Sequence, residues 1–525
     1  MGLKVERWTL AVGQGLFHYE EVWLDSQSRP LTIVYDAGTI KQDCDSRSTP
    51  VRSIYFVRSH IRHLANGILD YLILSHFHQD HFNLMDKLIK KIHVRYFIAP
   101  LLTPEKNFFE ITIIAEQWDQ AKKYTPYSSP YHTKFMNSVV EGLVKDGSEG
   151  FCKALFRQNQ HQDRYHNDIY DKHTQFIFIT DDEDKTADGQ SNRDSIVHGF
   201  PEKLENDADS QVLNHSQTIN IKKMSSPTPF WQLAFFYSKP TNIYSKMNEE
   251  ARKKIREEFG KAYTNQQEGS LDAGKHHSKG SEKRQQTGPI GRVLAKKDKN
   301  HPPIYIPIDP DTDKAATLKS IFGDSNLNMT SLVMYSGAAT IPKIAVKKTL
   351  TTQYSSQKKY IPQTLTYFVP VKQKGQKSTR AKCSESSLCK KCRSCLLNCL
   401  YADKNVGVKH LSVRHCYWSW MGFGDLNFET NKTINQFIKH FQAHGNLLDY
   451  VGCCTAPHHG SKNGFKTSQI PELLSGAVCL ISCDPCANYH HPHSEALTAM
   501  LKGGMIPVLV TDKKDSTFHE IILLR

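Results

Sequence analysis

The chain has 525 residues, 39% of them hydrophobic, which is longer than one ordinary domain and enough to bury a large core. No apolar run reaches the ~18 residues of a membrane span, and the first six residues read as a strand rather than a secretory signal. We therefore expect a cytoplasmic protein without membrane contact, whose thirteen cysteines are mostly reduced. The net charge of +14 permits nucleic acid or another polyanion as a partner, although a solvated basic surface is the commoner cause of such an excess.

The first part of the chain alternates expected strands with short loops. Residues 10–15 end in a glycine turn, and residues 31–35 read as a strand that runs into Asp36. Residues 71–75 form a short apolar run that is typical of a buried strand. The sequence His-Phe-His-Gln-Asp-His follows directly at 76–81, on a loop at a strand end, where functional sites usually lie.

Four of these six residues carry side chains that bind metals. His76 and His78 can point to one metal ion from such a loop, while Asp80 and His81 turn toward a second. Imidazole nitrogens with a carboxylate and no thiolate suit Zn²⁺, and to a lesser degree Mn²⁺ or Fe²⁺. The alternative is a histidine-rich surface turn, and the density of ligands after an apolar strand favours the metal site.

The middle of the chain is longer than the connection between two halves of one domain requires. A helix over 82–92 and a strand over 94–98 continue the first half, residues 181–215 read as a mobile acidic loop, and residues 230–237 return as a strand. We expect five segments: a first β/α half over 1–180, a partly disordered insertion with strand 230–237 over 181–330, a core strand and the start of a further insertion over 331–369, a cysteine-rich basic knob over 370–412, and a second half over 413–525.

The knob carries a second group of potential ligands. Its cysteines include a run spaced C-x₂-C-x₂-C-x₃-C and are Cys383, Cys389, Cys392, Cys395 and Cys399. This pattern fits a structural zinc site best, with an iron–sulfur cluster or a metal-free segment as alternatives. Basic residues flank it, and Lys390, Lys391 and Arg393 are candidate contacts to nucleic acid phosphates, although a charge run is usually a solvated face. A protein partner docked through the insertion is a further alternative.

The last part of the chain holds three short polar motifs. The sequence Gly-Phe-Gly-Asp ends at Asp425, Ala-Pro-His-His-Gly-Ser spans 456–461, and Asn-Tyr-His-His-Pro spans 488–492. Each motif has an ordinary explanation when taken alone, because Asp425 could cap a helix and His458 and His459 could be loop residues. In series behind the motif at 76–81, they predict one assembled site.

This series of motifs resembles that of the metallo-β-lactamase-fold hydrolases, and it is closest to the DNA-uptake (ComEC-type) subgroup. The resemblance covers residues 1–120, 225–240, 325–340 and 412–525. It implies an α/β fold, the four-layer αββα sandwich of the metallo-β-lactamase type, interrupted by a large insertion. In that family the aspartate matching Asp36 orients ligand histidines from behind, and the one matching Asp425 bridges two metals.

The resemblance also distributes the ligands. His76, His78 and His459 would bind one metal, Asp80, His81 and His491 the other, and Asp425 would bridge them. His458 is assigned no metal and would face the substrate or the leaving group, so Asp80 and His458 are the candidate catalytic residues. Two metals ~3.5–4 Å apart can share a hydroxide that attacks phosphorus or a carbonyl carbon.

The preferred interpretation is a metal-dependent hydrolase, a phosphodiesterase or nuclease that uses this bridging hydroxide. It is based on the motifs of the DNA-uptake subgroup and on the basic insertion. One alternative is hydrolysis of a small ester, thioester or lactone. Another is a nucleic-acid-binding or protein-binding subunit with an incidental metal site. The sequence leaves the oligomeric state open.

Overall fold

The computed structural model describes sixteen stretches of the chain. They are residues 2–25, 29–40, 48–103, 111, 130–160, 174–181, 196–200, 210–237, 331–340, 344–351, 363–370, 418–428, 430–465, 467–484, 491–513 and 516–524. The chain divides into two compact units, of which the first comprises Met1–Pro100, His166–Ser238 and Thr330–Arg525 and the second Leu101–Tyr165 and Lys239–Met329. In the described parts, no helix is long and apolar enough to span a membrane.

The first unit contains a ten-stranded mixed sheet in the order β13-β12-β18-β1-β2-β3-β4-β5-β6-β8. The neighbours from β13 to β3 are antiparallel, and those from β3 to β8 are parallel. The strands are β1 Leu3–Thr9, β2 Phe17–Leu24, β3 Leu31–Ala37, β4 Ile68–Ile73, β5 His93–Pro100, β6 Gln175–Thr180, β8 Gln211–Asn214, β12 Ile344–Thr351, β13 Gln363–Pro370 and β18 Phe518–Leu524.

The second sheet of this unit has eight strands in the order β17-β16-β15-β14-β11-β10-β9-β7. Its strands from β17 to β14 are parallel, and β14, β11, β10 and β9 pair antiparallel. The strands are β7 Ile196–Phe200, β9 Thr218–Lys223, β10 Pro229–Tyr237, β11 Leu332–Ala338, β14 Ser419–Gly422, β15 Val451–Thr455, β16 Val478–Ser482 and β17 Ile506–Val510. The expected α/β class is therefore confirmed.

The two sheets pack face to face around one apolar core. Alternate residues of the strands enter it, including Ile33 and Tyr35 of β3 and Leu233 and Phe235 of β10. This period of two follows from the pleat, which sends successive side chains to opposite faces. All seven residues of β3 are nevertheless buried, because helices cover its other face.

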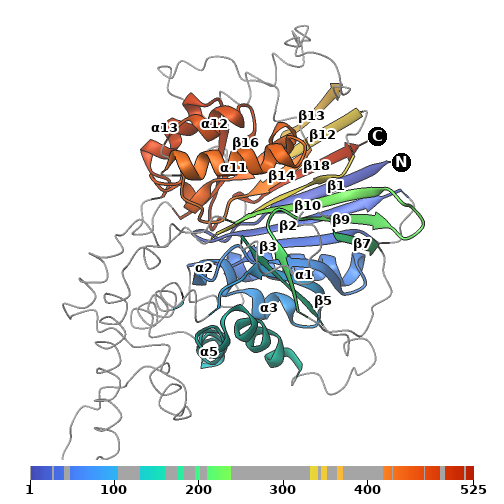
Figure 1. The fold of residues 1–525 in the computed structure, drawn as a ribbon, viewed down its shortest axis with the longest axis vertical. Helices are drawn as coiled ribbons and strands as arrows, with labels where there is room; N and C mark the ends of the chain where they lie inside the picture. The colour runs from blue at the N-terminus through green and yellow to red at the C-terminus, as the bar shows by residue number, and fades with distance from the viewer. Residues whose placement is uncertain are drawn as a thin grey trace, which may run out of the picture. The chain divides into compact units, whose positions relative to one another are not determined.

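Helices cover the outer face of each sheet (Figure 1). α1 Thr49–Leu64, α2 Gln79–Phe82 and α3 Met85–Ile89 lie over the first sheet, where α1 contacts β4 and both α2 and α3 contact β3. α11 Asn431–Ala443, α12 Gln469–Leu473 and α13 Ser494–Lys502 cover the second. α11 buries Ile434, Phe437 and Phe441, which recur at helical spacing, and the Thr430 side chain caps its first turn by accepting the N–H of Thr433.

A polar network crosses the core between the sheets. Buried Arg7 pairs with Glu20 and with Glu520, which is 3.2 Å away. Glu20 also accepts the hydroxyl of Ser336 at 2.7 Å, and Ser336 accepts the indole N–H of Trp231 at 2.9 Å. Because a buried polar group is costly without its partner, this network fixes how β1 and β2 of the first sheet face β10 and β11 of the second.

The second unit contributes the helical segment α5 Pro130–Gln160 to the described residues. It is broken at Asp146 and Gly147, where Gly147 has a φ of +64°. Leu102 and Ser148 hold this break through two hydrogen bonds of 2.7 and 2.9 Å.

Several expected elements occur where the sequence indicates them. The strands predicted at 31–35, 71–75, 94–98 and 230–237 correspond to β3, β4, β5 and β10, although β4 ends at Ile73. The helix predicted over 82–92 is shorter and is α3. Residues 181–215, expected as a mobile loop, contain β7 and β8, which extend the sheets by pairing with β9 and β6.

Candidate metal centre

The site lies at the carboxyl ends of strands from both sheets. Asp36 lies near the end of β3, and β4 leads into the motif at 76–81. β14 and β15 lead into Asp425 and the pair His458–His459. Within each of these strand pairs the strands are parallel, so both ends open at the same edge. This is the usual place for a site in an α/β sheet.

Close backbone packing holds the first motif in place. A Cβ on Gly38 would lie 2.3 Å from the carbonyl carbon of Asp80 and 2.4 Å from the nitrogen of His81. The loop after β1 adds a hydrogen bond of 3.3 Å from the N–H of Leu16 to the carbonyl of Asp80. Glycine is therefore needed where the loop after β3 meets α2, the short helix that carries Asp80 and His81.

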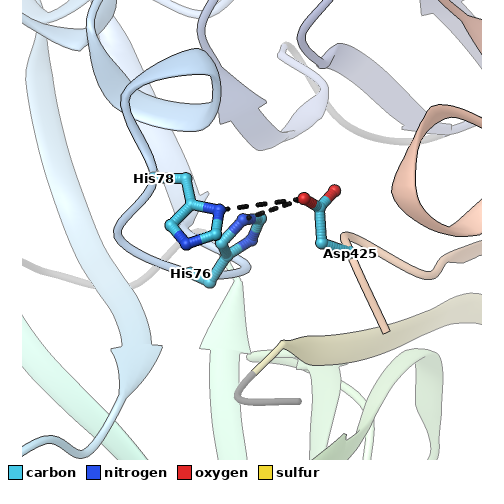
Figure 2. A group of neighbouring side chains, drawn as sticks. All are labelled: His76, His78 and Asp425. Atoms are coloured by element: carbon cyan, nitrogen blue, oxygen red, sulfur yellow. Dashed lines mark ion pairs between the residues drawn. The ribbon is translucent and has the colours of Figure 1, made fainter. Parts of the chain in front are cut away.

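One group of ligand atoms consists of His76, His78 and Asp425 (Figure 2). The two rings come from the same loop and point toward the carboxylate on the opposite segment. His76 Nε2 lies 3.5 Å and His78 Nδ1 3.8 Å from Asp425 Oδ2. These separations suit nitrogen and oxygen atoms that share one metal rather than a direct hydrogen bond.

A second group consists of Asp80, His81 and His459. His459 Nε2 lies 3.2 Å from Asp80 Oδ2, and His81 Nε2 lies 3.9 Å from the same oxygen. Asp425 Oδ1 is 3.2 Å from His81 Nε2 and 3.6 Å from His459 Nε2. Asp425 therefore turns one oxygen to each group, as a bridging carboxylate does.

Hydrogen bonds behind the rings decide which nitrogens carry hydrogen. His81 Nδ1 lies 2.8 Å from Asp36 Oδ2, and His459 Nδ1 lies 2.8 Å from the carbonyl of Ser482. Both oxygens only accept at these positions, so each Nδ1 donates, and each Nε2 presents a lone pair to the centre when the ring is neutral.

His76 is held in the same tautomer by Ser75. The Ser75 hydroxyl donates to Asp36 at 2.7 Å, so its oxygen accepts from His76 Nδ1 at 2.9 Å. Ser331 lies 3.1 Å from the same nitrogen and accepts the N–H of Asp425 at 2.8 Å, which connects the first motif to the aspartate. Such partners behind metal-binding histidines fix ring orientation.

The inward atoms of this centre have no hydrogen bonds. The Nε2 atoms of His76, His81 and His459 and Oδ1 of Asp425 are buried and lack hydrogen-bond partners. Lone pairs and carboxylate oxygens that converge in a buried space repel one another, and unsatisfied buried polar atoms are rare in native proteins. A divalent cation would satisfy them, so the residues present fit a metal centre.

Carboxylates and imidazoles of the metal-free centre stabilise one another's charged forms. Although burial opposes it, Asp425 and Asp80 raise the pKa of His81 and of His459. Burial would raise the pKa of Asp425, but His458, His76 and His81 around it hold that pKa well below its usual value. The pKa of Asp80 is also lowered, because His81 and His459 outweigh its burial. Burial lowers the pKa of His76 to about 3. The carboxylates are therefore ionised and His76 is neutral, whereas His81 and His459 hold protons that a divalent cation would displace.

The structure distributes the two adjacent histidines differently from the expected ligand set. His459 is grouped with Asp80 and His81 rather than with His76 and His78. His458 instead has Nε2 3.8 Å from Asp425 Oδ2, the oxygen that faces the first group. The reason is local: both residues have positive φ, 47° and 53°, in a tight turn, η5 Pro457–Gly460, that the periodicity of a sequence does not indicate.

His491 is buried near the centre but belongs to neither group. Its ring centroid lies 5.4 Å from that of His458 and 6.3 Å from that of His459. Burial, with His459 and His458 nearby, lowers the pKa of His491 to about 3. Its expected role as a ligand with Asp80 and His81 stays a prediction.

Asp36 occupies the position expected of an orienting residue. The sequence did not indicate Ser75 or Ser482 as orienting partners, because serine next to a strand end is common and only the fold brings it to a ring nitrogen. The knob cysteines Cys383, Cys389, Cys392, Cys395 and Cys399 and the basic residues Lys390, Lys391 and Arg393 lie outside the described residues.

No protein-family model matches this chain, and no curated protein matches its sequence.

Proposed function

We propose that this protein is a dinuclear metal-dependent hydrolase acting on phosphodiesters, with nucleic acid as the substrate class. The observation that carries the proposal is the convergence of three buried Nε2 lone pairs on a shared aspartate, Asp425. His76, His78 and one oxygen of Asp425 would hold one ion, and Asp80, His81, His459 and the other oxygen would hold the second. Zinc is the preferred ion, because the donors are nitrogen and oxygen.

We infer the finer fold from the same residues. Two facing sheets with helices on each outer face, and ligands at the strand ends, support the four-layer αββα sandwich of the metallo-β-lactamase type. The Gly-Phe-Gly-Asp and Pro-His-His-Gly-Ser motifs add the resemblance to its DNA-uptake subgroup.

When bound, two divalent ions would activate water and stabilise the charge that develops on phosphorus. Hydrolysis forms a bond between the water oxygen and phosphorus, breaks the bond to the leaving alcohol and transfers one proton to that alcohol. His458 is suited to hold this proton: its side chain is 29% exposed, compared with 4% for His459. Together with His78 and Asp80, it forms the accessible side of the centre, at 12% and 18% exposure.

A phosphodiester is favoured over a small ester by the charge of the chain. Lysine and arginine exceed aspartate and glutamate by 14, which suits a polyanionic substrate more than a neutral one. A neutral ester or lactone would gain nothing from this excess.

The test combines metal analysis with a substrate panel. Purified protein should contain two divalent ions per centre and hydrolyse bis(p-nitrophenyl) phosphate and nucleic acid, but not p-nitrophenyl acetate or a lactone. Asp425→Asn should lose bound metal and lower turnover by several orders of magnitude, because activation of water and charge stabilisation are lost together. Glu472→Gln, an exposed carboxylate on α12, is the matched control and should behave as the unchanged protein.

Three results would contradict the proposal. Preferential turnover of the ester would favour the small-molecule alternative. Nucleic-acid binding without hydrolysis of any substrate by metal-loaded protein would favour the binding subunit. Full metal content and normal turnover in Asp425→Asn would remove the bridging role.

A further inference from the structure

Helix α1 presents an outer face of basic and aromatic side chains. Its 16 residues contain three arginines and two histidines but no acidic residue. Its outward positions recur at helical spacing and are exposed: Arg52, Tyr55, Phe56, Ser59 and Arg62. The opposite face is apolar and buried against the first sheet. The helix is therefore held on the sheet by its apolar face, and the outer side chains are available for other contacts.

The neighbouring helix α3 enlarges the basic area (Figure 1). Lys87, Lys90 and Lys91 are partly or fully exposed on α3 and its end, whereas the acidic residue of this segment, Asp86, is buried. The Arg58 guanidinium connects the two helices by donating to the carbonyl of Lys87 at 3.2 Å. No exposed carboxylate interrupts the cations of α1 and α3, both of which are described throughout.

The aromatic rings are held in position from below. Tyr55 is 42% and Phe56 37% exposed, and the Arg58 guanidinium lies 4.9 Å from the Tyr55 ring. Phe56 packs edge-on against Trp8 at 5.8 Å between centroids and lies 4.3 Å from His60. Two rings that are fixed beside arginines offer stacking surfaces whose side-chain entropy is already reduced.

Hydrogen bonds on the buried side of α1 connect its first turns to the loop that supports Asp80. The hydroxyl of Ser53, in the first turns of α1, donates to the carbonyl of Ala11 at 3.3 Å. Ala11 belongs to the loop after β1, whose Leu16 N–H donates to the carbonyl of Asp80 at 3.3 Å. A strand lying along α1 would therefore end beside the loop that supports the catalytic motif.

We propose that α1 and α3 form a docking face for single-stranded nucleic acid, with the arginines and lysines on phosphates and Tyr55 and Phe56 stacked on bases. This inference depends on the proposed function, because it names the substrate class of the same centre. Cations alone would serve a duplex equally well, but exposed rings can stack only on bases that are not paired. The face from Arg52 to Arg62 is ~15 Å long, about four nucleotides at the ~3.4 Å rise of one DNA strand.

The test measures binding to purified full-length protein without cleavage. The probe is a labelled phosphorothioate oligothymidylate of about 16 nucleotides, the upper site size of single-strand grooves. Arg52→Gln with Arg62→Gln should flatten the slope of log affinity against log salt by ~1.4, because each phosphate that is no longer neutralised reduces this slope by ~0.7. Lys432→Gln with Lys439→Gln removes the same charge from α11, where both lysines are exposed, and should leave the slope unchanged.

A second pair of variants tests the face without removing cations. Ser59→Glu places a negative charge between the rings and Arg62 and should weaken binding, whereas Ser59→Gln should not. Tyr55→Ala should weaken single-strand binding by about fivefold or more, from ~1 kcal/mol or more per stacked base. A ribonucleotide probe should respond in the same way, and a duplex should be insensitive to Tyr55→Ala.

Several outcomes would overturn the docking face. One is unchanged oligonucleotide affinity in both the Arg52→Gln, Arg62→Gln double variant and Ser59→Glu, with native circular dichroism spectra. Another is that the unchanged protein binds no oligonucleotide. The third is that it binds only phosphatidylserine vesicles. All of these variants should hydrolyse bis(p-nitrophenyl) phosphate normally. If the unchanged protein hydrolyses no phosphodiester, the proposed function fails. The binding data still show whether α1 and α3 form a docking face for single-stranded nucleic acid.

Discussion

Replacing Asp36 by asparagine tests whether the hydrogen bonds behind the histidines build the metal centre. Asp36 Oδ2 accepts the N–H of His81 at 2.8 Å and the hydroxyl of Ser75 at 2.7 Å, and Oδ1 accepts the backbone N–H of Ser75 at 2.7 Å. The variant keeps the shape of the side chain. Asparagine also tolerates the left-handed backbone of this position, where φ is 58°.

The expected loss follows from the donors around the new amide. Its NH₂ group must replace one of the two oxygens, and in the position of Oδ2 it would face two other donors. His81 can remove this conflict by carrying its hydrogen on Nε2 instead of Nδ1, but Nε2 is the atom that faces Asp425 and the second ion. Loss of an orienting partner typically weakens metal binding 10- to 100-fold, or ~1.4–2.8 kcal/mol.

The assay is a titration of zinc against a competing chelator. Asp36→Asn should bind the ion of Asp80, His81 and His459 10- to 100-fold more weakly, because Asp36 contacts His81 directly. The ion of His76 and His78 should be affected less, because Asp36 reaches His76 only through Ser75. Asp86→Asn is the matched control, since Asp86 is a buried acid on α3 that contacts none of the ligands in the described structure. If Asp36→Asn bound both ions as tightly as the unchanged protein does, with a native circular dichroism spectrum, the orienting role of Asp36 would be refuted.

Three further predictions concern stability and local geometry. Burial raises the pKa of Asp86 from 3.8 to about 6, so the folded protein is most stable with this carboxyl protonated and loses stability as the pH rises from 3.8 to about 6. Asp86→Asn lacks this loss. In urea titrations its unfolding free energy, relative to that of the unchanged protein, should therefore rise by about 3 kcal/mol between about pH 3 and about pH 8. Gly38→Ala should displace the motif at 76–81 and lose metal, as measured by elemental analysis. Gly445→Ala should retain metal: its methyl meets nothing within 4 Å, and its positive φ of 89° places the strain in the turn after α11. Phe437→Ala should lower the unfolding free energy by about 3–5 kcal/mol, because it opens a cavity under α11. Gln436→Ala, at an exposed position of the same helix, should change it by less than about 0.5 kcal/mol. Similar losses in the two variants would contradict the packing described for this helix.

The features that could be predicted from the sequence are those set by neighbouring residues. The apolar run before His76 predicted the buried strand β4, and the run at 230–237 predicted β10, because a run of apolar side chains needs no distant partner to be recognised. The same holds for the six-residue motif, whose four ligand side chains come from one loop. The α/β class was predicted from the resemblance that these motifs carry.

Pairing between distant segments could not be predicted in this way. β7 and β8 have only five and four residues and lie within a polar stretch that reads as a loop, and they become strands because β9 and β6 provide their hydrogen bonds. Similarly, β12 pairs with β18, although more than 150 residues separate them in the chain. Strand formation at such places depends on a partner that local periodicity cannot reveal.

The sequence alone determined which chemical groups are available, and the tertiary structure decided how they are divided. His458 and His459 are adjacent and chemically identical. Their left-handed turn directs His458 to Oδ2 of Asp425 and His459 to Asp80. The carbonyl of Ser482 behind the His459 ring holds that ring in place. Backbone conformation at two positive φ angles is stabilised by the contacts around it rather than by the residues' own preferences, so this division arises only in the folded chain.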